Sequence, residues 1–369
     1  MSTTLHFSAP GRTEICGNHT DHQHGCVLAA AVNLEVCAEV TPCPDGVVRV
    51  ISEGYAPFEI RLDSLSAREN ERGTTAALVR GIAAGIAARG YTLHGFEAQV
   101  RSSVLPGSGL SSSAAFEVLI GRIFNALCCG GLISPVEIAR ISQYAENVYF
   151  GKPSGLMDQM ASSVGGLVYI DFADEKNPVV EKIDFRFDDC GYTLCTINSG
   201  ADHADLTAEY AAIPRELGLI CAVFGKKYLR DVDESTFYSR LPELRRAAGD
   251  RAVLRAMHIY DENRRVRTIV DALRRGDFDG FLRCVNESGD SSWQYLQNIT
   301  PTGATGHQEM ALTLALSKRL LGGRGAVRVH GGGFAGTALA FVPDDIYAAF
   351  VQGMENMLGH GCCIPLRIV

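Results

Sequence analysis

The sequence lacks the features that would place it in several large classes of protein. Its twelve cysteines include no Cys-x-x-Cys pair and follow no framework spacing, so we expect no structural zinc site. No run reaches the 18 or so apolar residues that are needed to cross a bilayer. The first residues do not join a basic segment to an apolar one, as a signal peptide would. We therefore expect a protein of the reduced cytoplasm, without a membrane partner.

Basic charge is also scarce. Lys and Arg number 34 against 42 Asp and Glu, which gives a net charge of −8 at pH 7. No basic cluster with interleaved aromatic residues occurs, so nucleic acid is not expected as a partner. A phosphate-bearing ligand remains compatible with this charge, because backbone amides at a helix N-terminus can hold an anion whatever the net charge.

The chain has enough apolar mass for two domains of ordinary size, since 46% of its 369 residues are hydrophobic and 21% are charged. Strands and helices are mixed without strict βαβ alternation, which indicates an α+β fold. Residues 173–189 combine acids, Lys and Pro without glycine. We interpret this stretch as a connector and predict two domains, at residues 1–185 and 186–369.

Hydrophobic periodicity and turn residues predict the individual elements. The predicted strands are 36–40, 47–51, 96–104, 325–329 and 337–342. The predicted helices are 74–89, one that follows residue 113, 135–149, one within 154–164, 206–222, 241–258 and 261–275.

A Gly/Ser segment, Leu105-Pro-Gly-Ser-Gly-Leu-Ser-Ser-Ser-Ala-Ala115, precedes one of these helices. Gly107 and Gly109 let the backbone turn with exposed amides, and the serines open a helix whose first N–H groups have no internal partner. With the helix dipole, this arrangement suits an anion such as phosphate. No Gly-Lys-Ser/Thr follows, so the segment is not a Walker A loop. A simple helix-capping turn is the alternative interpretation.

Near the N-terminus, Ala9-Pro-Gly-Arg-Thr-Glu-Ile-Cys-Gly-Asn-His-Thr-Asp-His-Gln-His-Gly25 gathers one Arg, one Asp and three His. Beside the apolar run 27–32, this density indicates polar groups held against a core, as in a ligand pocket. A metal site like that of a metallohydrolase is the alternative, although Gly17 occupies the place of the first His in such a motif. The candidate metal ligands are His19, Asp21, His22 and His24.

Two further segments contain unusual residues. Gly151-Lys-Pro-Ser-Gly-Leu-Met-Asp-Gln-Met-Ala-Ser162 sets Asp158 and Gln159 in an apolar helical pattern, where a carboxylate is costly unless it is paired or functional. An acid stabilised by the helix dipole is the alternative. Val327-Arg-Val-His-Gly-Gly-Gly-Phe-Ala-Gly-Thr337 places a glycine triplet after a strand, which permits close approach of a ligand or forms only a tight turn.

Taken together and in this order, the four segments resemble the motifs of GHMP kinases, and of galactokinases in particular. Pro-Gly-Arg…Gly-Asn-His-Thr-Asp-His resembles the galactokinase signature, and Gly-Ser-Gly-Leu-Ser-Ser-Ser-Ala-Ala resembles the phosphate loop. Gly-Leu-Met-Asp-Gln resembles the catalytic segment, and Glu146 precedes Asp158 by twelve residues, as the family's metal-binding glutamate does. His330-Gly-Gly-Gly-Phe-Ala-Gly resembles the C-terminal glycine motif. The resemblance extends from about residue 8 to about residue 342.

The resemblance implies an ATP-dependent kinase that phosphorylates the anomeric hydroxyl of a galactose-type sugar. Asp158 would accept the hydroxyl proton, and Arg12 would keep Asp158 ionised and steady the transferring phosphoryl group. The implied fold is an N-terminal domain like ribosomal protein S5 domain 2 packed on a ferredoxin-like C-terminal domain, as a monomer or weak homo-oligomer. The other implied roles are phosphate binding by Gly107, Ser108, Gly109, Leu110, Ser111, Ser112 and Ser113, Mg²⁺ binding by Ser113 and Glu146, and sugar contacts from Asn18, His19, Asp21, Gly155 and Tyr210.

The sequence departs from the family at two places. Asn18 stands where galactokinases have Glu, and His22 where they usually have Tyr. Because Asn18 removes a negative charge near the sugar's 6-position and adds an NH₂ donor, galacturonate is a second candidate substrate beside galactose. Thr75 and Leu78 stand where the family typically has Trp and Tyr near adenine, so the base preference is open. A non-catalytic sugar sensor on the same fold is a further alternative.

Overall fold

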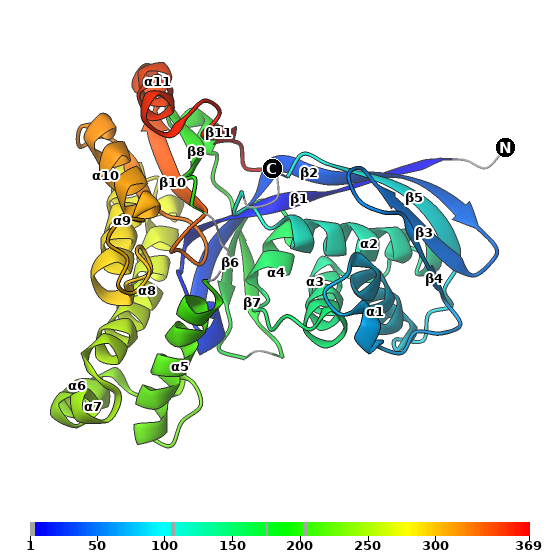
Figure 1. Ribbon diagram of the computed structural model, residues 1–369, viewed down its shortest axis with the longest axis horizontal. Helices are drawn as coiled ribbons and strands as arrows, with labels where there is room; N and C mark the ends of the chain where they lie inside the picture. Colours follow the sequence, from blue (N-terminus) through cyan, green and yellow to red (C-terminus); the bar gives the residue numbers. More distant parts are fainter. Residues whose placement is uncertain (1–3, 105–107, 175, 202–205) are drawn as a thin grey trace.

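The computed structural model describes residues 4–104, 108–174, 176–201 and 206–369, and it consists of two β-sheets with helices packed against each (Figure 1). The strands of the first sheet are β1 (Leu5–Cys16), β2 (Cys26–Cys43), β3 (Val47–Ser52), β4 (Phe58–Arg61), β5 (Gly95–Ser102), β6 (Leu167–Asp171) and β7 (Val179–Ile183). Those of the second sheet are β8 (Tyr192–Asn198), β9 (Ala326–Val329), β10 (Thr337–Pro343) and β11 (Cys363–Leu366).

Helices make up most of the rest of the described chain. The α-helices are α1 (Thr75–Ala87), α2 (Ser112–Cys128), α3 (Pro135–Tyr144), α4 (Met157–Val164), α5 (Thr207–Val223), α6 (Glu234–Ser239), α7 (Leu241–Ala248), α8 (Asp250–Arg274), α9 (Phe278–Ser291), α10 (Glu309–Leu321) and α11 (Tyr347–Leu358). Two π-helical segments are η3 (Ala145–Phe150) and η6 (Ser292–Leu296), and short 3₁₀ turns are η1 (Asp21–Gln23), η2 (Glu69–Glu71), η4 (Phe187–Asp189), η5 (Leu229–Asp231) and η7 (Asp344–Ile346).

The long strand β2 organises the first sheet. It pairs antiparallel with β1 along most of its length, with β5 through its second half and with β6 through its first five residues. Helices α1 to α4 lie together on one face of this sheet (Figure 1). The strands alternate buried apolar residues such as Val36, Ala38 and Val40 with more exposed ones, so their apolar side chains meet the helices in one core.

The second sheet has the strand order β11-β8-β10-β9, with all neighbours antiparallel. In chain order this is fourth, first, third, second, with helices α5 to α10 between its first two strands and α11 between its last two. That order is the ferredoxin-like arrangement. The α+β class and the ferredoxin-like arrangement expected for the C-terminal half are therefore confirmed.

The structure corrects several element predictions. The expected helix break near residue 260 lies instead at Gly249, whose φ of 87° ends one helix and begins the 25-residue α8. Buried Ile259, Glu262 and Val266 continue one helical face through the predicted break. The predicted strand 36–40 is the middle of β2, and the predicted helix 135–149 changes to a π-helix at Ala145. The predicted elements include no counterpart of the helices α6, α9, α10 and α11 or of the strands β1, β4, β6, β7, β8 and β11.

The two sheets are joined near the C-terminus. After β11, Ile368 bridges Val32 of β2, and Val369 N–H donates to the Ala31 carbonyl at 3.0 Å. The chain therefore returns from the second sheet to the first. The boundary near residue 185 remains a prediction, with β7 before it and β8 after it.

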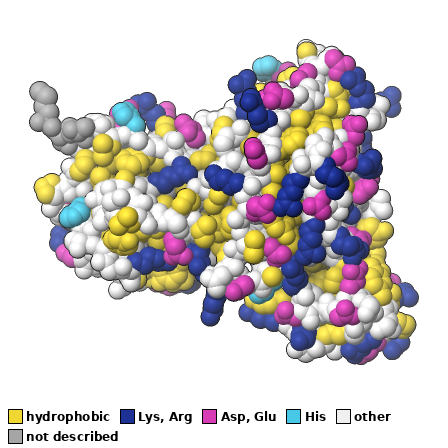
Figure 2. Space-filling model, turned by 180° about the vertical axis from the view of Figure 1, so that it is seen from behind, with side chains coloured by type: hydrophobic (Ala, Val, Ile, Leu, Met, Phe, Trp, Pro, Cys, Tyr) yellow, Lys and Arg dark blue, Asp and Glu magenta, His cyan; other side chains and the backbone are white. Residues whose placement is uncertain are grey.

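The surface of the second half carries both charge signs. Figure 2 shows Lys and Arg side chains interspersed with Asp and Glu over the lobe that holds the second sheet and its helices. Among the described residues, we find no helix that combines the length and the apolar character needed to cross a membrane.

Candidate active site

Arg12 and Asp158 form a bidentate ion pair at the centre of the candidate site. Arg12 Nε donates to Asp158 Oδ1 at 2.6 Å, and Arg12 Nη2 donates to Oδ2 at 2.7 Å. Arg12 is 8% exposed and lies just after a register shift in β1, whereas Asp158, in the first turn of α4, is 30% exposed. Burial works to raise the pKa of Asp158, but the Arg12 charge and hydrogen bonds from Arg12 and Ser111 lower it below its ordinary value. Asp158 is therefore ionised at neutral pH.

The predicted phosphate loop touches this pair. Arg12 Nη1 donates to the Gly109 carbonyl at 2.5 Å, and Arg12 N–H donates to the Leu110 carbonyl at 2.9 Å. Ser111, the residue before α2, has a φ of 56° and donates its hydroxyl to Asp158 Oδ2 at 2.7 Å. Such a backbone is costly for a non-glycine residue and persists where the surroundings enforce it. Ser108 also lies in this loop, and Gly107 falls outside the described residues.

Residues of the second sheet contact the phosphate loop through hydrogen bonds. His330, at the end of β9, donates to Thr337 Oγ1 across 3.0 Å, and Thr337 donates to the Ser108 carbonyl at 3.1 Å. The Glu14 amide donates to the other ring nitrogen of His330, which assigns the proton to Nδ1. A Cβ on Gly109 would lie 2.5 Å from Thr337 Oγ1. The loop therefore needs glycine there because a side chain from the other sheet fills the space.

Glu146, in η3, is buried and held by three side chains. Its Oε2 accepts from Ser154 Oγ at 2.5 Å and from Gln159 Nε2 at 2.7 Å, and its Oε1 pairs with Lys152 Nζ at 3.1 Å. Gln159 follows Asp158 directly in α4. One residue of this helix is therefore the candidate base, and the next one holds the candidate metal ligand Glu146. π-Helical segments are frequently found at functional sites.

A second buried carboxylate lies behind Glu146. Glu117 is fully buried and accepts from the same Gln159 Nε2 at 3.0 Å. Burial, followed by the nearby Glu146 charge, raises the pKa of Glu117 well above its ordinary value. Glu117 lies one helical turn after Ser113 on α2, and Gln159 links Glu117 to Glu146 through hydrogen bonds to both carboxylates. Ser112 and Ser113 are half-buried in the first turn of this helix.

Asp21 and Gly155, two of the residues predicted to contact the sugar, lie against each other. Asp21 Oδ1 accepts from the His22 amide at 2.8 Å, and a Cβ on Gly155 would overlap Asp21 Oδ2. Burial raises the pKa of Asp21 to about 6, assisted by the charges of Glu14 and Asp158 and opposed by the His22 hydrogen bond. Because Gly155 has no side chain, the Asp21 carboxylate can contact the backbone at residue 155, three residues before Asp158.

Asn18 does not have the geometry that the sequence predicts for a sugar ligand. Its side chain is fully buried, and Nδ2 donates both protons, to Glu14 Oε1 at 3.1 Å and to the Gly331 carbonyl at 2.6 Å. Its Oδ1 accepts from Asn298 Nδ2 at 2.8 Å and Ser292 Oγ at 3.3 Å. Every hydrogen-bonding position of the amide is used by the protein. In this structure Asn18 therefore supports the site from within the protein, and its assignment as a sugar ligand stays a prediction.

The histidines nearby form a hydrogen-bond chain. His19 Nε2 lies 3.0 Å from the Gly332 carbonyl, and its Nδ1 lies 3.1 Å from His22 Nε2. His22 Nδ1 lies 3.4 Å from Gln23 Nε2, and Gln23 Oε1 accepts from the Leu229 amide at 3.0 Å. Burial lowers the pKa of His19, and burial followed by the His19 charge lowers that of His22 to about 3. Both rings are therefore neutral and bonded to each other.

This chain bears on the metal-site alternative. His19 and His22 use their ring nitrogens on each other and on the protein, and the His24 ring stacks on Tyr228 with centroids 3.6 Å apart. Within the residues that the structure describes, we find no group of three or more His, Cys, Asp or Glu that could hold a metal ion. The geometry therefore does not support a hydrolase-type metal centre at residues 19–24.

Tyr210, from α5, meets the glycine triplet. Its hydroxyl donates to the Gly333 carbonyl at 2.9 Å, and a Cβ on Gly332 would lie 2.8 Å from its ring. Burial raises the pKa of Tyr210 to about 12. The triplet consequently brings His19, Asn18 and Tyr210 together, although these residues come from distant parts of the chain.

The sequence prediction missed two charged residues close to Glu146, namely Glu117 and Lys152. Glu117 has a recognisable signal, because it is the only charged residue in the buried stretch 114–120 of α2. Lys152 has none, since a lysine beside glycine and proline is ordinarily a solvated surface residue. Only the fold places its ammonium against Glu146.

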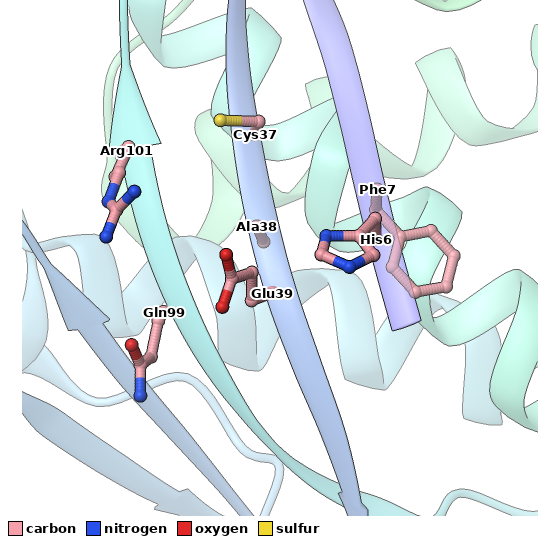
Figure 3. Close-up of a pocket in the computed structure, with 7 residues that line it drawn as sticks. All are labelled: His6, Phe7, Cys37, Ala38, Glu39, Gln99 and Arg101. Carbon is pink, nitrogen blue, oxygen red and sulfur yellow. The ribbon is translucent and has the colours of Figure 1, made fainter. Parts of the chain in front are cut away.

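A separate hollow lies on the open face of the first sheet. Figure 3 shows it on β1, β2 and β5. Its lining residues are His6, Phe7, Cys37, Ala38, Glu39, Gln99 and Arg101. His6 and Arg12 are six residues apart on β1, which places the hollow roughly 20 Å from the candidate active site along an extended strand.

Comparison with known proteins agrees with this geometry. Residues 77–166 match the family described as GHMP kinases N terminal domain, and residues 2–42 match the galactokinase galactose-binding signature. The chain is 33% identical over 349 residues to the galactokinase of Glaesserella parasuis serovar 5, covering 91% of this chain and 85% of that protein. It is 30% identical over 354 residues to the galactokinase of Streptomyces coelicolor, covering 95% and 87%.

A solved structure gives the same result in three dimensions. The galactokinase of Lactococcus lactis, complexed with galactose, superposes with a TM-score of 0.81 at 25% identity, covering 99% of this chain and 93% of that one. The match spans both sheets and therefore both sides of the candidate site. The chain belongs to the galactokinase family of GHMP kinases.

Proposed function

We propose that this protein transfers the γ-phosphoryl group of ATP to the anomeric (C1) hydroxyl of D-galactose, producing galactose 1-phosphate and ADP. The observation that supports this most directly is the Arg12–Asp158 pair beside the phosphate loop, with Ser111 bonded to the same carboxylate. An ionised carboxylate next to the N-terminus of α2 suits a hydroxyl that attacks a bound phosphate. The family relationship supports the same reaction.

Asp158 orients the sugar hydroxyl and accepts its proton as the oxygen–phosphorus bond forms. The Arg12 contacts make this carboxylate a weak base, which is adequate because phosphoryl transfer depends mainly on positioning and electrostatics. Arg12 also supplies fixed positive charge where negative charge develops on the transferring group. The amides of residues 108–113 and the N-terminus of α2 would hold the ATP phosphates.

Ser113 and Glu146 fit the Mg²⁺ that accompanies ATP. Both supply oxygen ligands, and Mg²⁺ usually takes only one or two protein ligands besides phosphates and water. The ion pair of the Lys152 ammonium with Glu146 Oε1 supports a role of this oxygen in binding a cation. When bound, Mg²⁺ would neutralise charge on the phosphates. Gln159 and Ser154 fix the other oxygen of Glu146 and so orient the carboxylate for it.

On the sugar side, we assign Asp21, Gly155 and Tyr210 to the pocket. Asp21 presents a carboxylate oxygen over Gly155, three residues before the candidate base. The galacturonate alternative depends on the loss of a negative charge at position 18 and on an amide donor from Asn18, and both donors of that amide are used within the protein. Galactose is therefore the better supported substrate.

The test is an ADP-release assay with Mg-ATP and galactose, galacturonate, N-acetylgalactosamine, glucose or arabinose. We expect turnover with galactose, and turnover with galacturonate alone would contradict the assignment. If no sugar gave ADP release while ATP still bound, the result would favour a non-catalytic sugar sensor. Asp158→Asn should lower kcat by at least about 10³-fold with ATP affinity nearly unchanged. The exposed Asp188→Asn serves as the matched control, and near-normal turnover of Asp158→Asn would exclude Asp158 as the base.

A further inference from the structure

The position of Lys152 is not explained by the roles assigned so far. It lies in the segment between η3 and α4, with 61% of its side chain exposed, while its partner Glu146 is 5% exposed. The ammonium contacts Glu146 Oε1 at 3.1 Å. A flexible, mostly solvated lysine therefore reaches into the site and covers the carboxylate of the candidate metal ligand.

The two oxygens of Glu146 have different surroundings. Oε2 is held by Ser154 and Gln159, which fix it from the protein side. Among the described residues, Oε1 is bonded only to Lys152. A metal ion that approaches Glu146 from the solvent side meets Oε1, so it competes with the ammonium for the same oxygen.

Arg12, the other positively charged residue described at the site, does not contact Glu146 but bonds other groups. Arg12 uses its guanidinium on both oxygens of Asp158 and on the Gly109 carbonyl. The Lys152 charge also acts on Asp158, whose ionised form it favours. Lys152 thus contacts the candidate metal ligand directly and acts on the candidate base through its charge, and its long side chain can turn away from Glu146.

We propose that Lys152 is a substrate-contacting residue of this kinase: its ammonium occupies the metal's place on Glu146 in the metal-free enzyme and moves to the ATP phosphates when the metal binds. The proposal rests on the proposed function. The exchange avoids an uncompensated buried carboxylate before metal arrives, which would be costly. After the exchange, a positive charge is available for a charge-assisted hydrogen bond to a phosphate oxygen.

The test compares wild type, Lys152→Met and Lys152→Arg, with exposed Lys182→Met on β7 as a matched control. Mn²⁺ binding without nucleotide is followed by electron paramagnetic resonance, and the affinity for ATP at saturating Mg²⁺ by calorimetry. We expect Lys152→Met to bind Mn²⁺ about 3- to 10-fold more tightly and ATP at saturating Mg²⁺ about 10-fold more weakly. Lys152→Arg should retain ATP affinity, and Lys182→Met should match wild type.

Unchanged Mn²⁺ affinity in Lys152→Met would overturn the competition at Glu146. Unchanged ATP affinity in that variant would overturn the phosphate contact. Both readouts are binding measurements, so they are independent of turnover. If the wild-type protein phosphorylated none of the sugars but the two affinities shifted as expected, the proposed reaction would fail while the role of Lys152 stood.

Discussion

Two carboxylates about the candidate site have pKa values displaced in opposite directions. Arg12 and Ser111 lower the pKa of Asp158 despite its burial, whereas burial raises that of Asp21 to about 6. The difference arises because Asp158 has a guanidinium on both oxygens, while the hydrogen bond that Asp21 accepts comes from a backbone amide. Carboxyl groups whose pKa values are pushed apart in this way often take different roles at one site.

This contrast predicts a pH dependence of sugar use. As pH falls through about 6, Asp21 gains a proton and loses its negative charge, while Asp158 stays ionised. We expect kcat/KM for galactose to fall below about pH 6, approaching tenfold per pH unit, since kcat/KM reports groups of the free enzyme. Asp21→Asn should lower kcat/KM by about 10- to 100-fold at pH 8 and remove this inflection. Initial rates from pH 5 to 9 check it, and an unchanged inflection in the variant would assign it elsewhere.

The sequence motifs indicated correctly that Arg12 lies beside Asp158, although 146 positions separate them. The motifs did not indicate the direction in which Asn18 points. Its partners Ser292, Asn298 and Gly331 lie far along the chain, and only the fold brings them to one amide. Residue identity at a motif position therefore predicts the chemistry available there but not the orientation of the side chain.

At the scale of elements, the π-helical η3 depends on close packing against α1. A Cβ on Gly81 would lie 2.7 Å from Ala145 Cβ and 2.8 Å from Ala145 Cα, so it would meet backbone. A Cβ on Gly85, one turn later, would lie 2.9 Å from Ile141 Cγ2, a side-chain methyl group on α3. The two glycines thus differ in what must move to accommodate a methyl group.

Gly81→Ala should destabilise the protein by about 1–3 kcal/mol, because η3 must shift to relieve the overlap. The same shift displaces Glu146, so the half-saturating Mg²⁺ concentration for turnover should rise several-fold. Gly85→Ala, the control, should cost less and leave the Mg²⁺ dependence near wild type, because its overlap is with one side-chain methyl of α3 and not with the backbone of η3. Urea unfolding and Mg²⁺ titrations of the rate test this. Equal effects of the two variants would contradict the role assigned to the packing.

Helices with regular apolar spacing, such as α1, could be predicted from the sequence because burial of one face repeats every three or four residues. The full length of β2 could not, since the apolar run before residue 33 fits a buried helix as well as a strand. The change from α3 to η3 was also hidden. A π-helix differs from an α-helix in hydrogen bonding, which no side-chain pattern around Ala145 reports.

At the scale of the whole molecule, Glu262 of α8 fastens the second half to the end of β1. This buried carboxylate accepts from the Gly17 amide at 3.0 Å and from Ser288 Oγ at 2.5 Å, and it pairs with Arg265. Burial works to raise the pKa of Glu262, but the charges of Arg265 and Arg328 lower it below its ordinary value. Its stabilising contribution is therefore present above about pH 4.5 and is lost as pH falls below that value.

Glu262→Gln should lower the free energy of unfolding by about 3–5 kcal/mol at pH 7, because it leaves buried Arg265 without its partner. The loss should shrink as pH falls below 4.5, where wild-type Glu262 becomes protonated during unfolding. Urea unfolding at pH 7 and pH 4 measures both effects. Glu287→Gln, an exposed neighbour of Arg265, is the control and should change stability by less than about 1 kcal/mol. An equal loss at both pH values would show that the charge is not the cause.

The two-sheet organisation was expected from the family resemblance, whereas composition and periodicity alone indicated only an α+β chain of two-domain size. The residues that join the halves, Glu262 to Gly17 and His330 to Thr13, pair across long sequence separations. No local pattern encodes such a pairing. The motifs located the candidate site because its chemistry is concentrated in short segments, and the supporting contacts required the structure.

The bridge between Val32 and Ile368 affects how the chain can fold as it is made. Strand β2 leaves the ribosome early, but the residues that bond Ala31 and Asn33 are synthesised long after it. Until then, that part of the strand has backbone groups without their final partners, and exposed strand edges favour aggregation. The nascent N-terminal half therefore exposes these backbone groups until the last residues of β11 and beyond are made, and it should aggregate more readily than the finished chain.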